Sequence, residues 1–307
     1  MRFTSGLALL LLLAVCSCQN EYRVERRACY YWRTTLQLSP EERSFLRQHD
    51  VGRIYLRYFD VVTDGAGGSL PNATLSFDDS LPRGLEVVPV IYIHNDCMRQ
   101  DATGLAEKIW KRVRQMNETN GIGPVNELQI DCDWTIQTRS RFFKLMEEFR
   151  QLCHSYGAKL SATIRLHQLS QPAPPVDRGV LMLYNTGDVT RLDVSKPILD
   201  IKDVKPYLHS LPHYPLELSA AYPLYTWHVL FRAGRYVGIM HGDDDLPVLP
   251  GDSIVVRQPS LDDILETEEA VEKVRPDINR EVILYDLSKN NIERFSLTDY
   301  ERIFKNP

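Results

Sequence analysis

The chain lacks any long hydrophobic run. Its longest purely apolar stretch, residues 7–15, has nine residues, whereas a helix needs about 20 to span the hydrocarbon core of a bilayer. A run of this length, preceded by Arg2, is typical of the core of a signal peptide. The sequence therefore excludes this segment as a spanning helix and predicts a domain that works outside the cytoplasm.

The chain also lacks an excess of charge and the motifs of common cofactors. With 36 basic and 41 acidic residues, its formal net charge is −5, which gives no reason to propose a nucleic acid or an anionic membrane surface as partner. The spacings of Cys29, Cys97, Cys132 and Cys153 form no metal or redox motif. No glycine-rich phosphate loop follows the first predicted strand. We therefore expect no nucleic-acid partner, no cofactor and no metal.

The residues after the apolar run resemble a bacterial lipobox. The small Ser17 precedes Cys18, which would carry the lipid, whereas bulky Val15 precedes Cys16. Gln19 follows Cys18 and resembles an outer-membrane rather than an inner-membrane sorting signal. The alternative is an ordinary cleaved signal peptide of a secreted protein.

This resemblance implies three segments. Residues 1–17 would be a lipoprotein signal peptide, residues 18–27 a tether, and residues 28–307 a single domain. We expect that domain to be anchored through lipid in the cell envelope, at the outer membrane, on either its periplasmic or its surface face.

Residues 128–135, LQIDCDWT, predict a buried strand with one polar face. Side chains alternate along a strand. The polar set is Gln129, Asp131 and Asp133, and the apolar set is Leu128, Ile130, Cys132 and Trp134. Buried carboxylates are unfavourable unless they are paired or hydrogen-bonded. We expect the polar face to line a barrel interior below an active or binding site; a structural network with arginine partners is the alternative.

Eight predicted strands alternate with helices along the chain. The strands are residues 29–34, 53–59, 86–93, 128–134, 159–166, 179–185, 216–222 and 281–286. Ser39 and Glu42 predict a capping box for the first helix, and Gly157 ends the helix before the fifth strand. This alternation predicts an α/β fold, a (β/α)8 TIM barrel.

The segment of residues 226–277 is long for a connection and predicts an insertion between strands seven and eight. Residues 236–240 and 253–256 could form a hairpin within it. The run HGDDD at 241–245 is interpreted as a solvated turn rather than as a calcium site.

The chemistry of such a barrel lies at the C-terminal ends of its strands. The residues that this rule selects for catalysis are Asp133 and Asp131. Those that it selects for substrate binding are Tyr184, Asn185, Arg57, Arg165, His167, Tyr222 and Trp32. Either Arg57 or Arg165 could pair with Asp131 and hold it ionised. An aromatic and acidic mouth suits a sugar, so the expected partner is a glycan or glycoconjugate.

Three motifs resemble the family 18 glycoside hydrolases, the chitinase family. The family's fourth strand reads DGxDxDWE, and Asp131, Asp133 and Trp134 match its middle aspartate, last aspartate and tryptophan. Residues 182–185, MLYN, are similar to the M-x-Y-D/N motif of strand six. Residues 221–225, AYPLY, are similar to the G-x-P-x-Y motif of strand seven. The resemblance implies the family's barrel across nearly the whole mature chain.

The departures from the family pattern concern the catalytic acid. In the family the last aspartate steadies the substrate's acetamido group, and a glutamate two residues later protonates the leaving oxygen. Thr135 stands at that glutamate position and Leu128 at the first aspartate. A threonine hydroxyl does not titrate usefully near neutral pH, so we do not expect chitinase activity by the family mechanism.

Two main functions remain open on the sequence. In the first, the protein is a hydrolase with Asp133 as acid or base and Asp60, Asp286 or Glu217 as the second carboxylate. In the second, it is a non-catalytic, lectin-like glycan-binding barrel that has lost the glutamate. A structural envelope lipoprotein with a vestigial pocket is a third possibility.

Overall fold

The computed structural model describes residues 24–240 and 246–305. The predicted signal peptide of residues 1–17, Cys18 and the acidic run of residues 241–245 lie outside the described residues.

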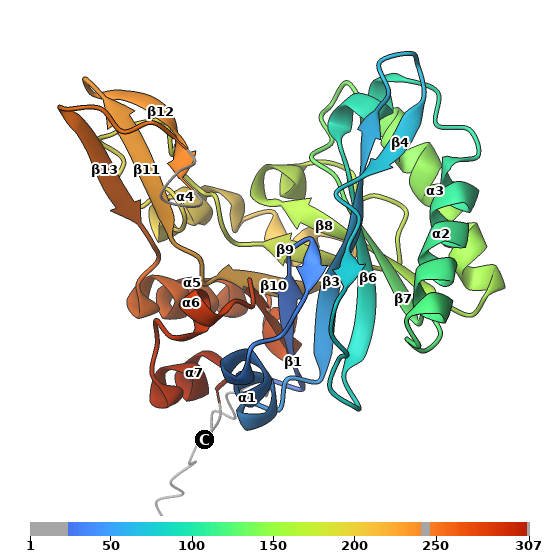
Figure 1. Cartoon of the computed structure of the whole chain (residues 1–307), viewed down its shortest axis with the longest axis horizontal. Coiled ribbons are helices and arrows are strands. Elements are labelled where there is room, and N and C mark those ends of the chain that lie inside the picture. Colours follow the sequence, from blue (N-terminus) through green and yellow to red (C-terminus); the bar gives the residue numbers. More distant parts are fainter. Residues whose placement is uncertain (1–23, 241–245, 306–307) are drawn as a thin grey trace, which may run out of the picture.

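Eight parallel strands form a closed barrel, which confirms the predicted fold (Figure 1). The ring closes because β3 pairs with β1 as well as with β6. In barrel order the strands are β1 (Arg26–Tyr31), β14 (Glu281–Tyr285), β10 (Glu217–Pro223), β9 (Arg178–Met182), β8 (Lys159–Arg165), β7 (Glu127–Asp131), β6 (Glu86–Ile93) and β3 (Arg53–Thr63). Each predicted strand corresponds to one of these.

Helices cover the outside of the barrel. The α-helices of the described chain are α1 (Pro40–Gln48), α2 (Leu105–Thr119), α3 (Arg139–Ser155), α4 (Ile201–Val204), α5 (Leu261–Val274), α6 (Lys289–Ile292) and α7 (Leu297–Ile303). The predicted capping box begins α1, because Ser39 Oγ accepts from the Glu42 N–H and the Glu42 carboxylate accepts from the Ser39 N–H. Within residues 24–240 and 246–305, no helix has the length and apolar character needed to cross a bilayer.

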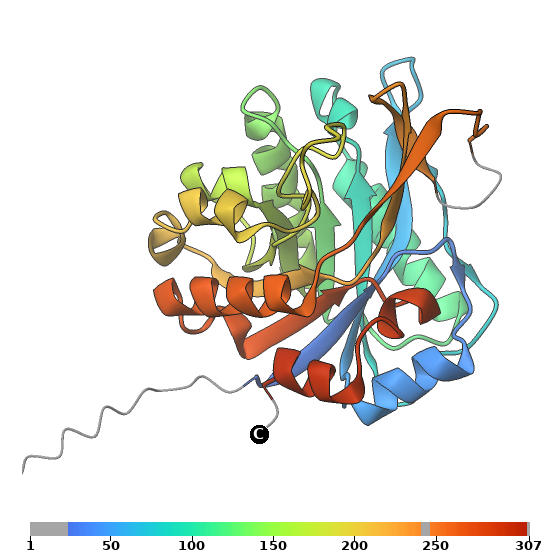
Figure 2. The same cartoon turned by 90° about the vertical axis from the view of Figure 1, so that its left-hand side faces the viewer.

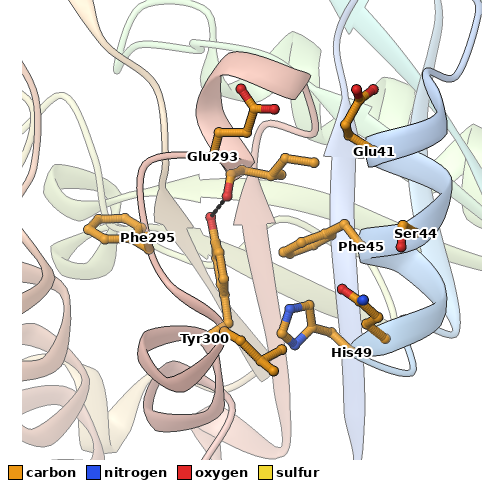
Figure 3. Close-up of a pocket in the computed structure, with 10 residues that line it drawn as sticks. Glu41, Ser44, Phe45, His49, Glu293, Phe295 and Tyr300 are labelled. Atoms are coloured by element: carbon orange, nitrogen blue, oxygen red, sulfur yellow. Dashed lines mark hydrogen bonds between the residues drawn. The ribbon is translucent and has the colours of Figure 1, made fainter.

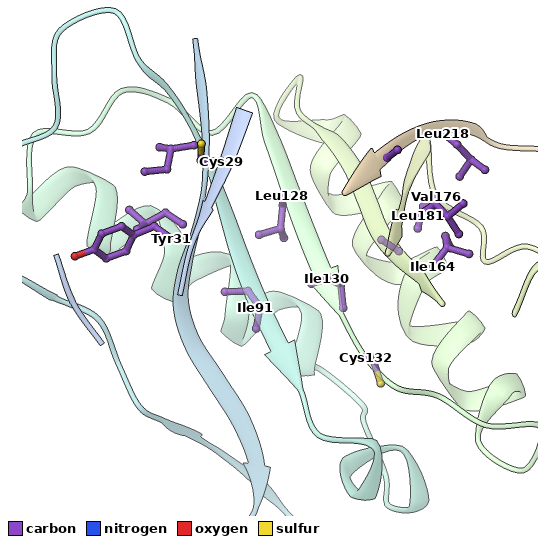
Figure 4. Close-up of a cluster of buried hydrophobic side chains, with 14 of the residues drawn as sticks. Cys29, Tyr31, Ile91, Leu128, Ile130, Cys132, Ile164, Val176, Leu181 and Leu218 are labelled. Carbon is purple, nitrogen blue, oxygen red and sulfur yellow. The ribbon is translucent and has the colours of Figure 1, made fainter. Parts of the chain in front are cut away.

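The apolar side chains form an outer and an inner core. Leu128, Ile130, Cys132 and Trp134 belong to the outer core, between the strands and the helices (Figure 4). The inner core fills the middle of the barrel with small and aromatic side chains, among them Tyr30 and Tyr55. The alternation predicted for residues 128–135 is therefore present, with Gln129 and Asp131 buried on the other face of β7.

A buried ionic network closes the N-terminal end of the barrel, which we call the base. Arg53 Nη1 lies 3.2 Å from a Glu127 carboxylate oxygen and 3.3 Å from one of Glu281. Arg178 Nη1 lies 3.3 Å from Glu127, and Arg178 also pairs with Glu281. These charges are paired with one another and hydrogen-bonded, as burial requires.

The insertion after β10 is a three-stranded sheet that rises beside the C-terminal end of the barrel, which we call the mouth (Figures 1 and 2). Its strands are β11 (Trp227–Arg232), β12 (Arg235–Met240) and β13 (Asp252–Arg257). The predicted hairpin is wrong in its pairing, because β12 and β13 flank β11 on opposite sides and do not pair with each other.

Shorter elements complete the fold. Strand β4 (Ser69–Asn72) extends β3 as an antiparallel hairpin above the mouth, and β2 (Thr35–Leu36) pairs with β5 (Ser76–Phe77). The 3-10 helices are η1 (Asn95–Arg99), η2 (Leu166–Ser170), η3 (Lys205–Tyr207), η4 (Leu211–His213) and η5 (Ile278–Arg280).

Candidate functional site

Arg165 binds both predicted aspartates at the mouth. Its Nη2 lies 3.0 Å from Asp131 Oδ1, and its Nε lies 2.6 Å from Asp133 Oδ1. Arg57 pairs with Asp60 instead and donates to the backbone carbonyl of Trp32 at 3.3 Å. Of the two arginines that the sequence offers to Asp131, the structure selects Arg165.

The two aspartates sit in different surroundings. Asp131 is buried, and Thr163 Oγ1 donates to its Oδ1 at 2.6 Å. Burial raises the pKa of Asp131, although Arg165 and the Thr163 hydroxyl act in the opposite direction. The Asp133 side chain is 51% exposed and accepts a hydrogen bond from the Tyr92 hydroxyl at 3.3 Å. Asp133 is therefore the carboxylate that a ligand at the mouth can reach.

Thr135 lies in the turn that leads into α3. Its backbone N–H donates to Thr138 Oγ1 at 2.9 Å, and that hydroxyl donates to Asn95 Oδ1 at 2.7 Å. The position that carries the acid in the resembled family thus holds an exposed neutral side chain. Nothing in this turn can donate a proton at neutral pH in the way a glutamic acid does.

The three proposed second carboxylates differ in placement. Asp60 is buried and ion-paired with Arg57, and its charge contributes to the raised pKa of Asp131. Glu217 is exposed at the first residue of β10, at the base, so its selection as a site residue is wrong. A parallel strand presents only its C-terminal end to the mouth.

Asp286 directly follows β14. Burial raises its pKa to about 6. Its carboxylate accepts from Asn291 Nδ2 at 2.6 Å, and the charges that act on it most come from Arg33 and Glu42. These partners belong to α6, to α1 and to the loop after β1, and Arg165 is not among them.

Six aromatic side chains form an arc around part of the mouth. In sequence order they are Tyr30, Trp32, Tyr184, Tyr225, Trp227 and Tyr285. Tyr285 is central, with ring centroids 5.5 Å from Tyr30, 5.5 Å from Trp32 and 4.8 Å from Tyr184, on which it stacks. Tyr225 extends the arc, 5.7 Å from Tyr285 and 5.2 Å from Trp227.

The arc and the ion pairs occupy opposite halves of the mouth. The arc comes from β1, β14, β9 and the segment that follows β10, whereas the charged groups come from β8, β7 and β3, with Tyr92 on β6. Each set of strands is contiguous in the barrel. The mouth therefore presents flat apolar rings on one side and hydrogen-bonding ionic groups on the other.

Most of the remaining predicted binding residues belong to the aromatic half of the mouth. Trp32 and Tyr184 belong to the arc, and Asn185 joins it because its Oδ1 accepts from the Tyr225 hydroxyl. That hydrogen bond connects the motifs at 182–185 and 221–225. His167 is exposed on η2, just after β8.

Tyr222 is a correction to the sequence prediction. Its ring is fully buried in the outer core, and its hydroxyl donates to Asn279 Oδ1 at 2.8 Å. Because strand side chains alternate, the neighbour Ala221 faces the barrel interior and Tyr222 faces the helices. It cannot contact a ligand at the mouth.

The sequence reasoning missed Tyr92, Thr163 and Tyr285 as site residues. Each lies near the C-terminal end of a barrel strand, and the rule that selected Asp133 could have selected them too. Among the described residues, no three His, Cys, Asp or Glu side chains are grouped to hold a metal ion.

A hollow of about 280 Å³ lies away from the mouth, between α1 and the α6–α7 region (Figure 3). Phe45, His49 and Tyr300 line it, and Glu41 and Glu293 stand at its upper rim in the figure. It lies outside the barrel and contains none of the residues described above.

Comparison with known proteins supports the same fold. A chitinase from Chromobacterium violaceum superimposes with a TM-score of 0.61 at 10% identity, over 91% of this chain and 98% of that one. The spore cortex-lytic enzyme SleL of Bacillus cereus gives 0.58 at 13% identity, over 92% and 74%. The family 18 chitinase of Cycas revoluta, in complex with (GlcNAc)3, gives 0.55 at 12%, over 91% and 98%.

No family model matches the chain, and no curated protein sequence matches it. The structural similarity therefore defines the class of fold. The chain has a glycoside-hydrolase-like TIM barrel of the kind found in the family 18 chitinases, and the predicted resemblance is confirmed at the level of the fold.

Proposed function

We propose that the protein is a glycan-binding barrel that binds a saccharide at the mouth without cleaving it by the chitinase mechanism. The observation that carries the proposal is the engagement of both aspartates by Arg165, next to a threonine at the position of the acid. The Asp133 carboxylate can accept hydrogen bonds from a ligand, and Thr135 cannot supply the proton that the family's glutamate donates.

The two halves of the mouth suit the two aspects of a pyranose ring. Its apolar face can lie on Trp32 or Tyr184, and its hydroxyls can donate to the Asp133 carboxylate and to the Tyr92 oxygen. The Cycas revoluta chitinase has been solved with (GlcNAc)3 and (GlcNAc)4, so N-acetylglucosamine oligomers are the first ligands to try.

Calorimetry on a soluble form without residues 1–18 tests binding, with (GlcNAc)4 as the probe. We expect saturable binding, at least about tenfold weaker in Asp133→Asn and in Trp32→Ala, because each removes one half of the contact. Asp262→Asn, an exposed carboxylate on α5, is the matched control and should bind as the wild type does. Wild-type affinity in both mouth variants would refute the proposal.

Hydrolysis by another route is the second candidate, favoured by one observation. Asp131 and Asp133 are neighbouring carboxylates in different environments, and burial raises the pKa of Asp131. Reducing ends released by pure protein over a long incubation, and lost in Asp133→Asn, would establish this function in place of simple binding.

The lipid anchor at Cys18 and the outer-membrane location are part of the proposal. They are supported by the lipobox and by Gln19, residues that lie outside the described structure. Metabolic labelling with a radioactive fatty acid should mark the wild type and leave Cys18→Ser unmarked.

A further inference from the structure

Two adjoining hollows lie on the outside of the barrel, along α2 and α3. They measure about 400 Å³ and 550 Å³ and share four lining residues, Trp110, Arg114, Glu118 and Tyr156. The two helices pack side by side on the barrel (Figure 1). Arg114 and Glu118 lie in the C-terminal half of α2, Trp110 lies near its middle, and Tyr156 follows the end of α3. The hollows therefore lie toward the base, away from the mouth.

Two aromatic side chains, Trp110 and Tyr156, form the common wall of these hollows, which we call the aromatic shelf. Tyr156 is 55% exposed, so its ring is accessible to a ligand. The Trp110 ring centroid lies 5.3 Å from that of Tyr156, and the Arg114 guanidinium lies 4.9 Å from the Tyr156 centroid. The Trp110 indole N–H is buried and has no hydrogen-bond partner among the described residues.

A hydrogen-bond donor and an acceptor stand beside the shelf. Arg114 and Glu118 are 3.6 Å apart on α2, and their side chains are 44% and 69% exposed. An exposed pair of this kind contributes little to stability, so a ligand can engage both groups. Neighbouring hydroxyls of a sugar accept from a guanidinium and donate to a carboxylate, while the sugar ring lies against tyrosine.

We infer that these hollows form a second saccharide-binding site, remote from the mouth, which takes a pyranose unit of a glycan chain. The choice of ligand class rests on the proposed function; the location rests on the shelf and the Arg114–Glu118 pair. Two sites on one barrel would raise the affinity for a polymer above that for a short oligomer, because the second contact becomes intramolecular.

The test compares insoluble chitin with (GlcNAc)4 and uses variants of each site. We expect Tyr156→Ala to bind chitin at least about tenfold more weakly than the wild type, while its mouth still binds (GlcNAc)4. Tyr156→Phe keeps the ring and should retain most of the affinity for chitin. Tyr236→Ala removes another exposed tyrosine, in the insertion, and is the matched control.

The outcomes separate the two sites. If Asp133→Asn abolishes all binding and Tyr156→Ala binds chitin as the wild type does, the second site is refuted and the mouth stands. If Tyr156→Ala alone loses binding, the second site stands and the mouth proposal fails. Wild-type protein that binds neither chitin nor (GlcNAc)4 would overturn both for this class of glycan.

Discussion

At the scale of residues, Arg165 couples stability to the candidate site. It neutralises Asp131, which is buried, and it also holds Asp133, which a ligand can reach. Removing one partner of a buried ion pair is costly because it leaves the other charge without compensation. The same guanidinium therefore fixes the geometry of the charged half of the mouth and compensates the charge of Asp131, which is buried below it.

Arg165→Met should lower the free energy of unfolding by about 3 kcal/mol, because Asp131 would remain buried without a cation. The double variant Arg165→Met/Asp131→Asn should recover most of that loss, since no buried charge is left. Urea denaturation followed by circular dichroism measures both. Equal stability of the single variant and the wild type would show that the ion pair contributes nothing.

Glu268 on α5 is a second buried carboxyl group, far from the mouth chemistry. Both of its carboxylate oxygens are buried and have no hydrogen-bond partner among the described residues. Burial raises its pKa well above the ordinary value, and Glu272 adds to the shift while Lys305 opposes it. The folded protein thus binds this proton more tightly than the unfolded chain does.

The sign of the resulting pH dependence follows from linkage. The stabilisation by protonated Glu268 is complete below the unfolded-state pKa of about 4.3 and is lost as the pH rises through the higher folded-state value. Glu268→Gln should remove this loss, so its stability relative to the wild type should increase from pH 5 to pH 8. Urea denaturation of both proteins at pH 5 and at pH 8 measures this change. If the difference in stability between the variant and the wild type is the same at both pH values, the raised pKa of Glu268 is contradicted.

At the scale of elements, Glu42 connects three segments of the chain. Its carboxylate accepts from Arg33 Nη2 at 2.8 Å, from the Ser39 N–H at 2.9 Å and from the Lys289 N–H at 2.9 Å. It therefore caps α1 and also fixes the loop after β1 and the start of α6. The Ser39 side chain accepts from the Glu42 N–H at 3.2 Å, within the helix cap.

Ser39→Ala should cost about 1 kcal/mol of stability, the usual value for a lost cap. Glu42→Ala should cost on the order of 3 kcal/mol, because the Arg33 guanidinium and the Ser39 and Lys289 N–H groups lose the acceptor that they share. Thermal unfolding of the two variants in parallel measures the difference. If the two melting temperatures fall by the same amount, the carboxylate acts as a cap alone.

The elements were predictable where local pattern determines them. Alternation placed Asp131 on the inner face of β7, and the capping residues at Ser39 and Glu42 marked the start of α1, whereas Asp133 lies just beyond the end of the strand. Pairing within the insertion depends on contacts between distant residues, so β11 was missed and β12 was wrongly joined to β13. Tyr222 was expected at the mouth, but the alternation along β10 directs its side chain toward the helices.

The candidate site was predictable only in part, because it also depends on contacts between residues that are distant in the sequence. The strand-end rule found Asp133 and Tyr184, but the choice of Arg165 over Arg57 depends on the barrel's closed geometry. The aromatic arc joins residues from separate strands, and no local spacing in the sequence reveals that Tyr285 stands at its centre.

At the scale of the whole molecule, charged side chains lie at both ends of the barrel and have different roles there. At the base, Arg53 and Arg178 are buried with Glu127 and Glu281, where they hold the strands together. At the mouth, Asp133 is half exposed and surrounded by groups that can bind a ligand. Variation at the base should therefore alter stability, and variation at the mouth should alter binding.

The base is also where the described chain begins, and this predicts the orientation of a lipid-anchored protein. β1 starts at Arg26, and the chain from Cys18 to Arg26 spans about 30 Å at most when extended. If Cys18 carries a lipid, the base stays within about 30 Å of the membrane, and we expect the mouth to point away from it.

Fluorescence quenching in proteoliposomes measures this orientation. A dye is attached to Ile136→Cys, which is exposed after β7 at the mouth, or to Asn120→Cys, which is exposed at the end of α2 near the base. The four described cysteines are buried and should not take up the dye. Quenchers in the lipid should act more strongly on position 120 than on position 136. Equal quenching, or stronger quenching at 136, would mean that the mouth faces the membrane or that the tether leaves the barrel free to turn.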